Sequence, residues 1–426
     1  MAVNPVTRAA RGGLLRRHRD FRQLWYGETA GKFGASVTSV LLPLTAVSVL
    51  HAGTFAVSVL NAASWVPWLV IGLPAGVWVD RLRRRTVMLV CDAVSCALFL
   101  SVPAAAWLGA LGIGQLLVVA LLAGTAAVFF QTAYTAYLPS LLDTADQAEG
   151  NAKLHGSAAA AQIAGTGSGG LIGQAAGAVG GLLTNAVTFL VSFVCVARIR
   201  HREAAPSGPG PREPLAEGVR AGVLLVARDP YLRSLTLFGA CSNLVLGGFQ
   251  ALLVLFLVRE VGLSSGAVGV LVGIGGAGGV LGALLVRRVA AGIGTARALL
   301  LFELGVPVLA PLMALARDGA GLAFFVIGYG AVSLGVVAGN IVKAGFLQGY
   351  CPSDVLGRVT ACSSFLNYGT LPLGALLAGA LGTLLGVRPT MWLLTSGMPL
   401  AALILCGAPI RSRRDLPAPV TAAEAD

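Results

Sequence analysis

Charged side chains inside otherwise apolar runs are the residues of this sequence that could do chemistry. Glu28 and Lys32 lie four residues apart, so on a helix they share one face and can pair. Lys343 has no acidic residue within a helical turn, and Asn340 lies one turn before it. A charge at membrane depth is costly and is a candidate functional group by default. For Glu28 and Lys32 the alternative is a local ion pair that only neutralises itself.

Further polar side chains in apolar runs could bind a substrate, although each could instead bond a neighbouring helix. They are Gln131, Tyr134, Gln162, Asn243, Gln250, Asn367 and Tyr368. No nucleophile, base and orienting group stand at a recognisable spacing, and the cysteines and histidines form no metal-binding pattern. Glycine-rich residues 273–279 lie in an apolar run, where they favour helix packing over nucleotide binding. The sequence therefore predicts no catalytic residue, metal or cofactor.

Composition indicates the elements that must position these side chains. The 426 residues are 56% hydrophobic and only 11% charged, with a mean hydropathy of +0.82. A soluble domain carries about 25% charged residues. The 57 glycines are typical of membrane helices, which pack closely through small residues. The chain is therefore expected to be an all-α integral membrane protein.

Twelve apolar runs are long enough to cross about 30 Å of hydrocarbon. They begin near Leu24, Phe55, Thr86, Ile113, Ser157, Leu182, Leu232, Ala267, Ala298, Leu322, Val359 and Thr390. Because the number is even, both termini are expected on the same side. Twelve helices in two pseudo-symmetric bundles of six are the expected fold.

The distribution of basic residues orients these spans. The 30 Lys and Arg residues concentrate in alternate breaks between the runs, and the opposite breaks hold only Arg259, Arg317 and Arg388. Positive charge marks cytoplasmic loops, so both termini are expected in the cytoplasm and the protein in the cytoplasmic membrane. The net charge of +12 thus needs no nucleic-acid partner.

Charge and proline content divide the chain. We expect a cytoplasmic N-terminal arm, a first six-helix bundle, a flexible cytoplasmic linker, a second six-helix bundle and a cytoplasmic tail. Their predicted bounds are residues 1–22, 23–199, 200–230, 231–410 and 411–426.

A family resemblance begins in the break between the second and third spans. Gly76, Asp80, Arg81, Arg84 and Arg85 stand there in order. The glycine would permit close helix approach, the aspartate could accept hydrogen bonds at a helix end, and the arginines could anchor the turn. The pattern resembles the signature loop of the major facilitator superfamily, with an arginine in place of the second glycine. A degraded copy, Gly282 followed by two arginines, comes after the eighth span.

The resemblance covers nearly the whole chain and narrows to the branch of drug, siderophore and macrolide exporters that includes the enterobactin exporter. The segments that carry it are DFRQLW at 20–25, YLPSL at 137–141, EGVR at 217–220, LGRV at 356–359 and TLPLGA at 370–375.

The resemblance implies that helices 1, 4, 7 and 10 line a central cavity. Lys32 and Lys343 would then face each other across it, which would suit an anionic or carboxylate-bearing ligand. Glu28 with Lys32 becomes the candidate coupling pair. Asp92 and Glu303, at equivalent places in the two repeats, are expected to be structural and to pair with the arginine-rich loops.

The chain departs from its relatives where coupling and gating residues are expected. Ala35 and Gln131 stand where relatives often carry acids, and Thr166 replaces the proline of the fifth-helix signature. A proton antiporter needs a carboxylate in the membrane. Glu28 is therefore the candidate substitute carrier.

The function that follows is export of a lipophilic small molecule, such as a drug or secondary metabolite, by alternating access. The substrate could be neutral or anionic. The protein would act as a monomer in the lipid bilayer, with protons as the candidate coupling ion. The alternative is a facilitator fold repurposed as a membrane enzyme or binding protein for a natural product, without ion coupling. A third alternative is an importer or a facilitative transporter.

Overall fold

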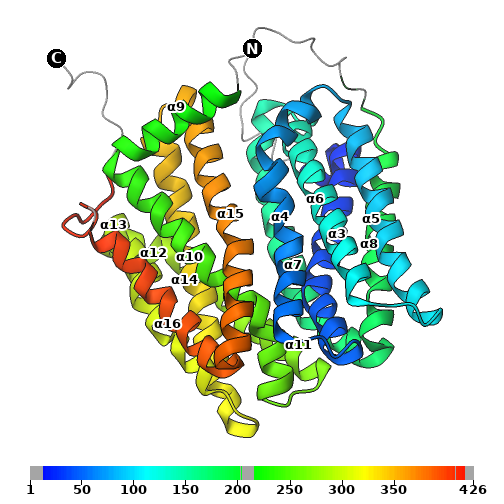
Figure 1. The fold of residues 1–426 in the computed structure, drawn as a ribbon. Helices are drawn as coiled ribbons and strands as arrows, with labels where there is room; N and C mark the ends of the chain where they lie inside the picture. The colour runs from blue at the N-terminus through cyan, green and yellow to red at the C-terminus, as the bar shows by residue number, and fades with distance from the viewer. Residues whose placement is uncertain (1–12, 202, 204–214, 408, 418–426) are drawn as a thin grey trace, which may run out of the picture. The chain divides into compact units, whose positions relative to one another are not determined.

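The computed structural model describes residues 13–201, 203, 215–407 and 409–417. The chain forms two compact units, which do not follow the order of the sequence. Unit 1 contains the described residues of Met1–Leu50 and Val70–Gly210, and unit 2 those of His51–Leu69 and Pro211–Asp426. Within each unit, long helices lie side by side, and the described residues form no strand (Figure 1).

Unit 1 is built on six long helices. The short helix α2, Leu14–Arg17, leads into α3, and the π-helical turn η1, Thr45–Val49, ends it. The long helices are α3 (Arg19–Leu44), α4 (Thr54–Asp80, whose first part belongs to unit 2), α5 (Arg84–Trp107), α6 (Ile113–Leu141), α7 (Thr144–Gly181) and α8 (Leu183–Ala197).

Unit 2 repeats the arrangement with more irregular helices. It begins with α9 (Leu215–Arg228), α10 (Pro230–Leu255), the π-turn η2 (Phe256–Glu260), α11 (Ser265–Gly276) and α12 (Gly278–Ile293). It continues with α13 (Thr295–Leu300), the π-turn η3 (Leu301–Gly305), the 3-10 helices η4 (Val306–Leu315) and η5 (Gly319–Gly321), α14 (Leu322–Tyr350), α15 (Ser353–Leu385) and α16 (Val387–Cys406).

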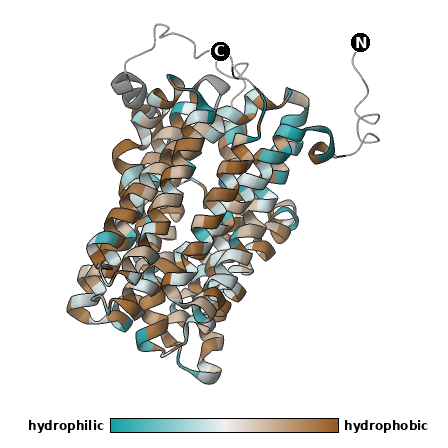
Figure 2. Ribbon diagram, turned by 90° about the vertical axis from the view of Figure 1, so that its right-hand side faces the viewer, coloured by the Kyte–Doolittle hydropathy of each residue, from teal (hydrophilic) through white to brown (hydrophobic). Residues whose placement is uncertain are grey.

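The expected all-helical membrane fold is confirmed. Ten helices of the described chain are long and apolar enough to cross a membrane, or eleven if the bent pair α7 and α8 is one span. That pair bends by 79°, and the expectation of about twelve spans counts its two helices separately. Hydrophobic residues occur along most of the length of the helices, and hydrophilic ones are found near several helix ends (Figure 2).

Two elements differ from the expected boundaries. Helix α7 begins at Thr144 rather than near Ser157, because polar residues extend it beyond its apolar part. Ion pairs hold that extension: Arg17 lies 3.6 Å from both Asp146 and Glu149. The second difference is α9, which lies within the expected linker. Linker residues 202 and 204–214 lie outside the described residues, as do 1–12 of the arm and 418–426 of the tail.

Small residues allow the closest helix contacts. In unit 1, a Cβ at Gly165 of α7 would come within 2.6 Å of the carbonyl oxygen of Phe33 on α3. In unit 2, the first part of α4 packs on α15 through small residues. A Cβ at Gly379 would come within 2.5 Å of the Ser58 side chain, and one at Gly369 within 2.8 Å of Leu69. This packing explains why residues 51–69 belong to unit 2.

Candidate functional site

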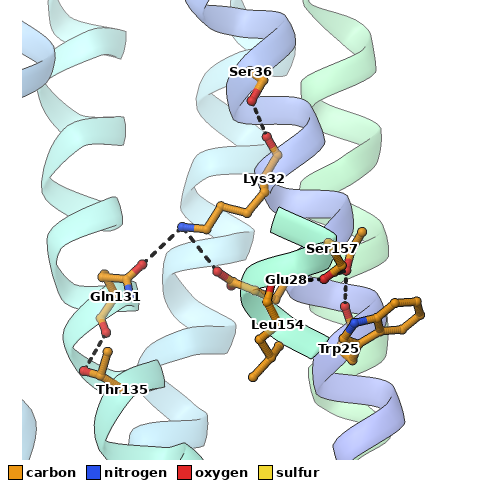
Figure 3. Close-up of polar contacts among 9 residues, drawn as sticks. Trp25, Glu28, Lys32, Ser36, Gln131, Thr135, Leu154 and Ser157 are labelled. Carbon is orange, nitrogen blue, oxygen red and sulfur yellow. Dashed lines mark hydrogen bonds and ion pairs between the residues drawn. The ribbon is translucent and has the colours of Figure 1, made fainter. Parts of the chain in front are cut away.

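Glu28, Lys32 and Gln131 form a polar cluster in unit 1, in a bilayer-spanning part of α3 and α6. The Lys32 ammonium lies 3.2 Å from the Glu28 carboxylate and donates a hydrogen bond of 3.2 Å to the Gln131 amide oxygen (Figure 3). Glu28 is 7% exposed, whereas the Lys32 side chain is 42% exposed. The local ion pair expected from the four-residue spacing is therefore present, and it recruits Gln131 from another helix.

Contacts between α3 and α7 fix the turn of helix that carries this cluster. The Thr29 hydroxyl donates to the Trp25 carbonyl at 2.7 Å and lies 3.0 Å from the Ser157 hydroxyl of α7. The Trp25 indole N–H donates to the Lys153 carbonyl at 3.3 Å. Because these bonds hold α3 in register with α7, the Glu28 and Lys32 side chains project from a defined face.

Asp92 lies on α5 in the interior of unit 1, where it is 1% exposed. Its carboxyl group is 2.7 Å from the Ser192 hydroxyl of α8, which can donate to it. The expectation that Asp92 pairs with an arginine-rich loop is wrong, because its partner is a serine of the neighbouring helix. The acid is buried among packed helices, about two helical turns after the arginines at the start of α5.

Lys343 and Glu303 form an ion pair in unit 2. The Lys343 ammonium on α14 lies 2.8 Å from the Glu303 carboxylate in the π-turn η3, and 5.0 Å from the centre of the Phe238 ring on α10. Glu303 is 5% exposed and the Lys343 side chain 20%. The expectation that Glu303 pairs with an arginine-rich loop is therefore wrong. Lys343, which lacks a nearby acid in the sequence, obtains one from another helix.

Helix geometry creates the space for this pair. The Glu303 carboxylate lies against Gly339, where any Cβ would collide with its oxygen and carbon atoms. The π-helical form of η3 precedes Pro307 and Pro311 of η4, which cannot continue a regular α-helix. The Glu303 carboxylate oxygen nearest to Lys343, Oε1, is buried and makes no hydrogen bond of good geometry. Its contact with the Lys343 ammonium is therefore an ion pair and not an aligned hydrogen bond.

The two clusters can do the same chemistry. In each, a carboxylate neutralises a lysine ammonium, and protonation of the carboxylate would free the lysine to bind an anion. The local pair of Glu28 and Lys32 is thus matched in unit 2 by a pair between Glu303 and Lys343, the lysine that has no acid within a turn of its own helix. An anionic ligand would have to compete with Glu28 or Glu303 for its lysine.

The structure brings the remaining expected residues into neither cluster as hydrogen-bond partners. Tyr134 is buried on α6, and the Asn243 amide donates back to the Gly239 carbonyl at 2.9 Å. Asn367 packs against Gly239. Exposed positions are occupied by Gln162, Gln250 and Asn340.

Tyr368 belongs to an aromatic cluster that was not expected from the sequence. Its ring lies 6.2 Å from that of Trp65, nearly parallel at 10°, and 5.4 Å from that of Trp68. Both tryptophans come from the part of α4 in unit 2. Tryptophan is usual at the ends of membrane helices. The sequence feature that could have indicated this cluster is the presence of Trp65 and Trp68 within one apolar run.

The arginine-rich turn is anchored differently from what its sequence suggests. Arg85 donates hydrogen bonds to the carbonyls of Val196 at 3.2 Å and Ala197 at 2.6 Å, and so holds the C-terminal end of α8. The close approach expected at Gly76 is absent, since a Cβ there would meet no described atom within 4 Å. In unit 2 the approach does occur, because a Cβ at Gly282 would lie 2.5 Å from the Leu334 carbonyl oxygen.

Of the other residues of this turn, Arg81 is exposed and Arg84 is partly buried. The side chain of Asp80 lies outside the described part of the structure.

Comparison with known sequences gives one family match over nearly the whole chain. Residues 15–420 match the family described as transmembrane secretion effector. The chain is 27% identical over 423 residues to the multidrug efflux pump Tap of Mycolicibacterium fortuitum, covering 96% of this chain and 99% of that protein. It is 28% identical over 380 residues to Tap of Mycobacterium tuberculosis (strain ATCC 25618 / H37Rv), covering 84% and 86%.

Comparison with solved structures shows the same fold in transporters of distant sequence. A bacterial homologue of the iron transporter ferroportin in an inward-facing state has a TM-score of 0.74 at 16% identity, covering 94% of this chain and 100% of that chain. The nucleoside transporter NupG has a TM-score of 0.72 at 10% identity, covering 91% and 98%.

Proposed function

Because the chain belongs to the transmembrane secretion effector family of the major facilitator superfamily, we propose that it exports lipophilic small molecules by alternating access of its two halves. It is a multi-pass secondary membrane transporter. The observation that carries the proposal is the family match over residues 15–420, which includes every helix long and apolar enough to cross a membrane. The multidrug efflux pumps among its relatives support drugs and similar metabolites as substrates.

The substrate pathway is proposed to use the polar side chains within the spans. Lys32 and Lys343 would contact an anionic substrate only when their carboxylate partners are neutralised, because each lysine is ion-paired. The other proposed contacts are Gln131, Tyr134, Gln162, Asn243, Gln250, Asn340, Asn367 and Tyr368.

Glu28 and Lys32 are the proposed coupling pair. Protonation of Glu28 would break its contact with Lys32, and substrate could then replace the carboxylate on the lysine. Ala35 and Gln131 cannot titrate, so Glu28 is the acid of this cluster that can exchange a proton. Substituting Glu28→Gln should abolish transport driven by a pH gradient while leaving substrate binding measurable. Full pH-driven transport by this variant would exclude Glu28 as the carrier.

The proposed setting is the cytoplasmic membrane, with both termini in the cytoplasm and the protein acting as a monomer. The alternation of basic breaks supports this orientation. The proposed halves are residues 23–199 and 231–410, joined by a cytoplasmic linker at 200–230.

Transport by purified protein in sealed liposomes tests the function. A panel of fluorescent lipophilic compounds, neutral, cationic and anionic, is loaded and its movement followed with and without a pH gradient. We expect at least one compound to cross unchanged at a rate above that of protein-free vesicles. Chemical conversion of a compound without its movement would contradict transport and support the enzyme alternative.

A further inference from the structure

Within the part of the chain that the structure describes, Asp92 is a buried acid without a counter-ion. Its carboxyl group is 1% exposed and has one hydrogen-bond partner among the described residues, the Ser192 hydroxyl at 2.7 Å. The ion pairs formed within the described chain do not include Asp92. Lys32 is paired with Glu28, and Lys343 is paired with Glu303. A buried carboxylate with no cation is strongly disfavoured, and binding a proton removes its charge.

The second unit supplies an internal comparison. Asp92 is the ninth residue of α5, and Glu303 is the ninth residue counted from the start of α13. Lys343, the partner of Glu303, is the twenty-second residue of α14, and the twenty-second residue of α6 is Tyr134. Unit 1 therefore has a neutral phenol at the position where unit 2 has the lysine that balances its acid.

Among the described residues, the titratable groups nearest to Asp92 do not provide a positive charge. Glu28 comes from α3, which packs on the same part of α8 as Asp92: a Cβ at Gly27, the residue before Glu28, would lie 3.4 Å from the Ser192 hydroxyl. The cysteines near Asp92 in the fold, Cys91 and Cys96 on α5 and Cys195 on α8, carry thiols and no positive charge. If both acids were ionised, Lys32 would be the cation for two carboxylates, and it contacts Glu28. One proton held between the two acids removes this imbalance.

Ser192 suits a group that changes its protonation state. A hydroxyl accepts a hydrogen bond from a protonated carboxyl group and donates one to a carboxylate, so the contact at 2.7 Å can persist in both states. A lysine partner, as at Glu303, would instead hold the carboxyl group in its ionised form.

We propose that Asp92 is a proton-binding site, protonated while Glu28 is paired with Lys32. This inference rests on the proposed transport function only for its role in coupling. When the Glu28–Lys32 pair opens, the O–H bond at Asp92 breaks and an O–H bond forms at Glu28, while Lys32 keeps its own protons. Ser192 then donates to the Asp92 carboxylate, and the number of protons in the pair of acids is unchanged.

Infrared difference spectroscopy of the purified full-length protein tests the site without any substrate. At neutral pH the wild-type protein should show a C=O stretching band of a protonated carboxyl group. The Asp92→Asn variant should lack this band. The matched control Glu303→Gln should keep it, because Glu303 is ion-paired at the equivalent position. Absence of the band from wild type, or its persistence in Asp92→Asn, would overturn the proposal.

A second variant covers the case in which Asp92→Asn does not fold. Ser192→Ala leaves the carboxyl group in place and removes its partner, so the band should remain but titrate at a different pH. An unchanged titration would contradict the contact between the two groups in solution.

A transport assay tests the coupling role separately from the proton-binding site. Asp92→Asn should lose pH-driven transport. A wild-type protein that transports no compound would refute the transport function without affecting the infrared result.

Discussion

Lys32 and Lys343 obtain their counter-ions in different ways. Glu28 precedes Lys32 by one helical turn, and this pair is local. Glu303 reaches Lys343 from η3, and Gly339 leaves room for the carboxylate. The second pair is also more buried, because the Lys343 side chain is 20% exposed and that of Lys32 is 42% exposed. Removing one partner of the ion pair should therefore lower the stability of the protein more in unit 2 than in unit 1.

Lys343→Ala should destabilise the protein by about 3–5 kcal/mol, because it leaves the Glu303 carboxylate buried without a cation. Thermal unfolding in detergent measures this effect. The double variant Glu303→Gln with Lys343→Met should recover much of the loss, since neither charge remains. A double variant as unstable as the single one would show that packing around Phe238, and not charge, holds this region together.

Binding measurements on the same variants test whether Lys343 contacts substrate. If Lys343 binds an anionic group, Lys343→Ala should weaken the binding of an anionic substrate and not that of a neutral one. Unchanged binding and transport of both would remove Lys343 from the substrate site. Glu303→Gln should have the opposite effect on the anion, because it frees the lysine.

At the scale of elements, glycines determine which helices approach closely. The run at residues 273–279 packs α11 and α12 against α14, as its place in an apolar span predicts. A Cβ at Gly275 would lie 2.5 Å from the Tyr329 ring, and one at Gly278 would collide with the Gly330 carbonyl. At Gly276 it would meet nothing within 4 Å. The run therefore contains both contact positions and open ones.

This difference makes a matched pair of variants possible. Gly278→Ala should cost about 1–3 kcal/mol, because the methyl group forces the α12 and α14 backbones apart. Gly276→Ala should leave stability unchanged or raise it by about 0.5–1 kcal/mol, since alanine favours a helix more than glycine does. The two melting temperatures in detergent measure the contrast. Equal melting temperatures of the two variants would contradict a close contact between α12 and α14 at Gly278.

The two units also cap equivalent helices in the same way. The Arg85 backbone N–H at the start of α5 donates to the Glu203 carboxylate at 3.2 Å, and the Thr295 N–H at the start of α13 donates to that of Asp415 at 2.9 Å. Each acid follows the last helix of its unit. Negative charge at a helix N-terminus is favourable, so these contacts join the beginning of one helix to the segment after another.

At the scale of the whole molecule, the charge pattern predicts an orientation. A fluorescent protein fused to the C-terminus should fluoresce, because it stays in the cytoplasm, whereas alkaline phosphatase fused there should be inactive. Phosphatase inserted at Gly262, between η2 and α11, should be active, because that break lies beside Arg259 on the side poor in positive charge. Active phosphatase at the C-terminus would reverse or disprove the predicted topology.

Hydropathy and helical spacing determined much of this protein from sequence. They predicted an all-helical membrane protein, the approximate starts of most spans, and the pair of Glu28 and Lys32. These features are local: a span needs a run of apolar residues, and an i,i+4 pair needs one turn of helix. The signature loop and its accompanying segments also led to the correct superfamily, which the match over residues 15–420 establishes.

Only the tertiary structure decided which side chains meet across helices. It gave Lys343 a counter-ion and left Asp92 with a serine, although the two acids occupy equivalent positions. It made Gly282 a close contact and Gly76 an open position, although both belong to copies of one motif. The physical reason is that the partner of a buried group depends on how helices rotate and pack, and this depends on many small contacts that no short segment contains.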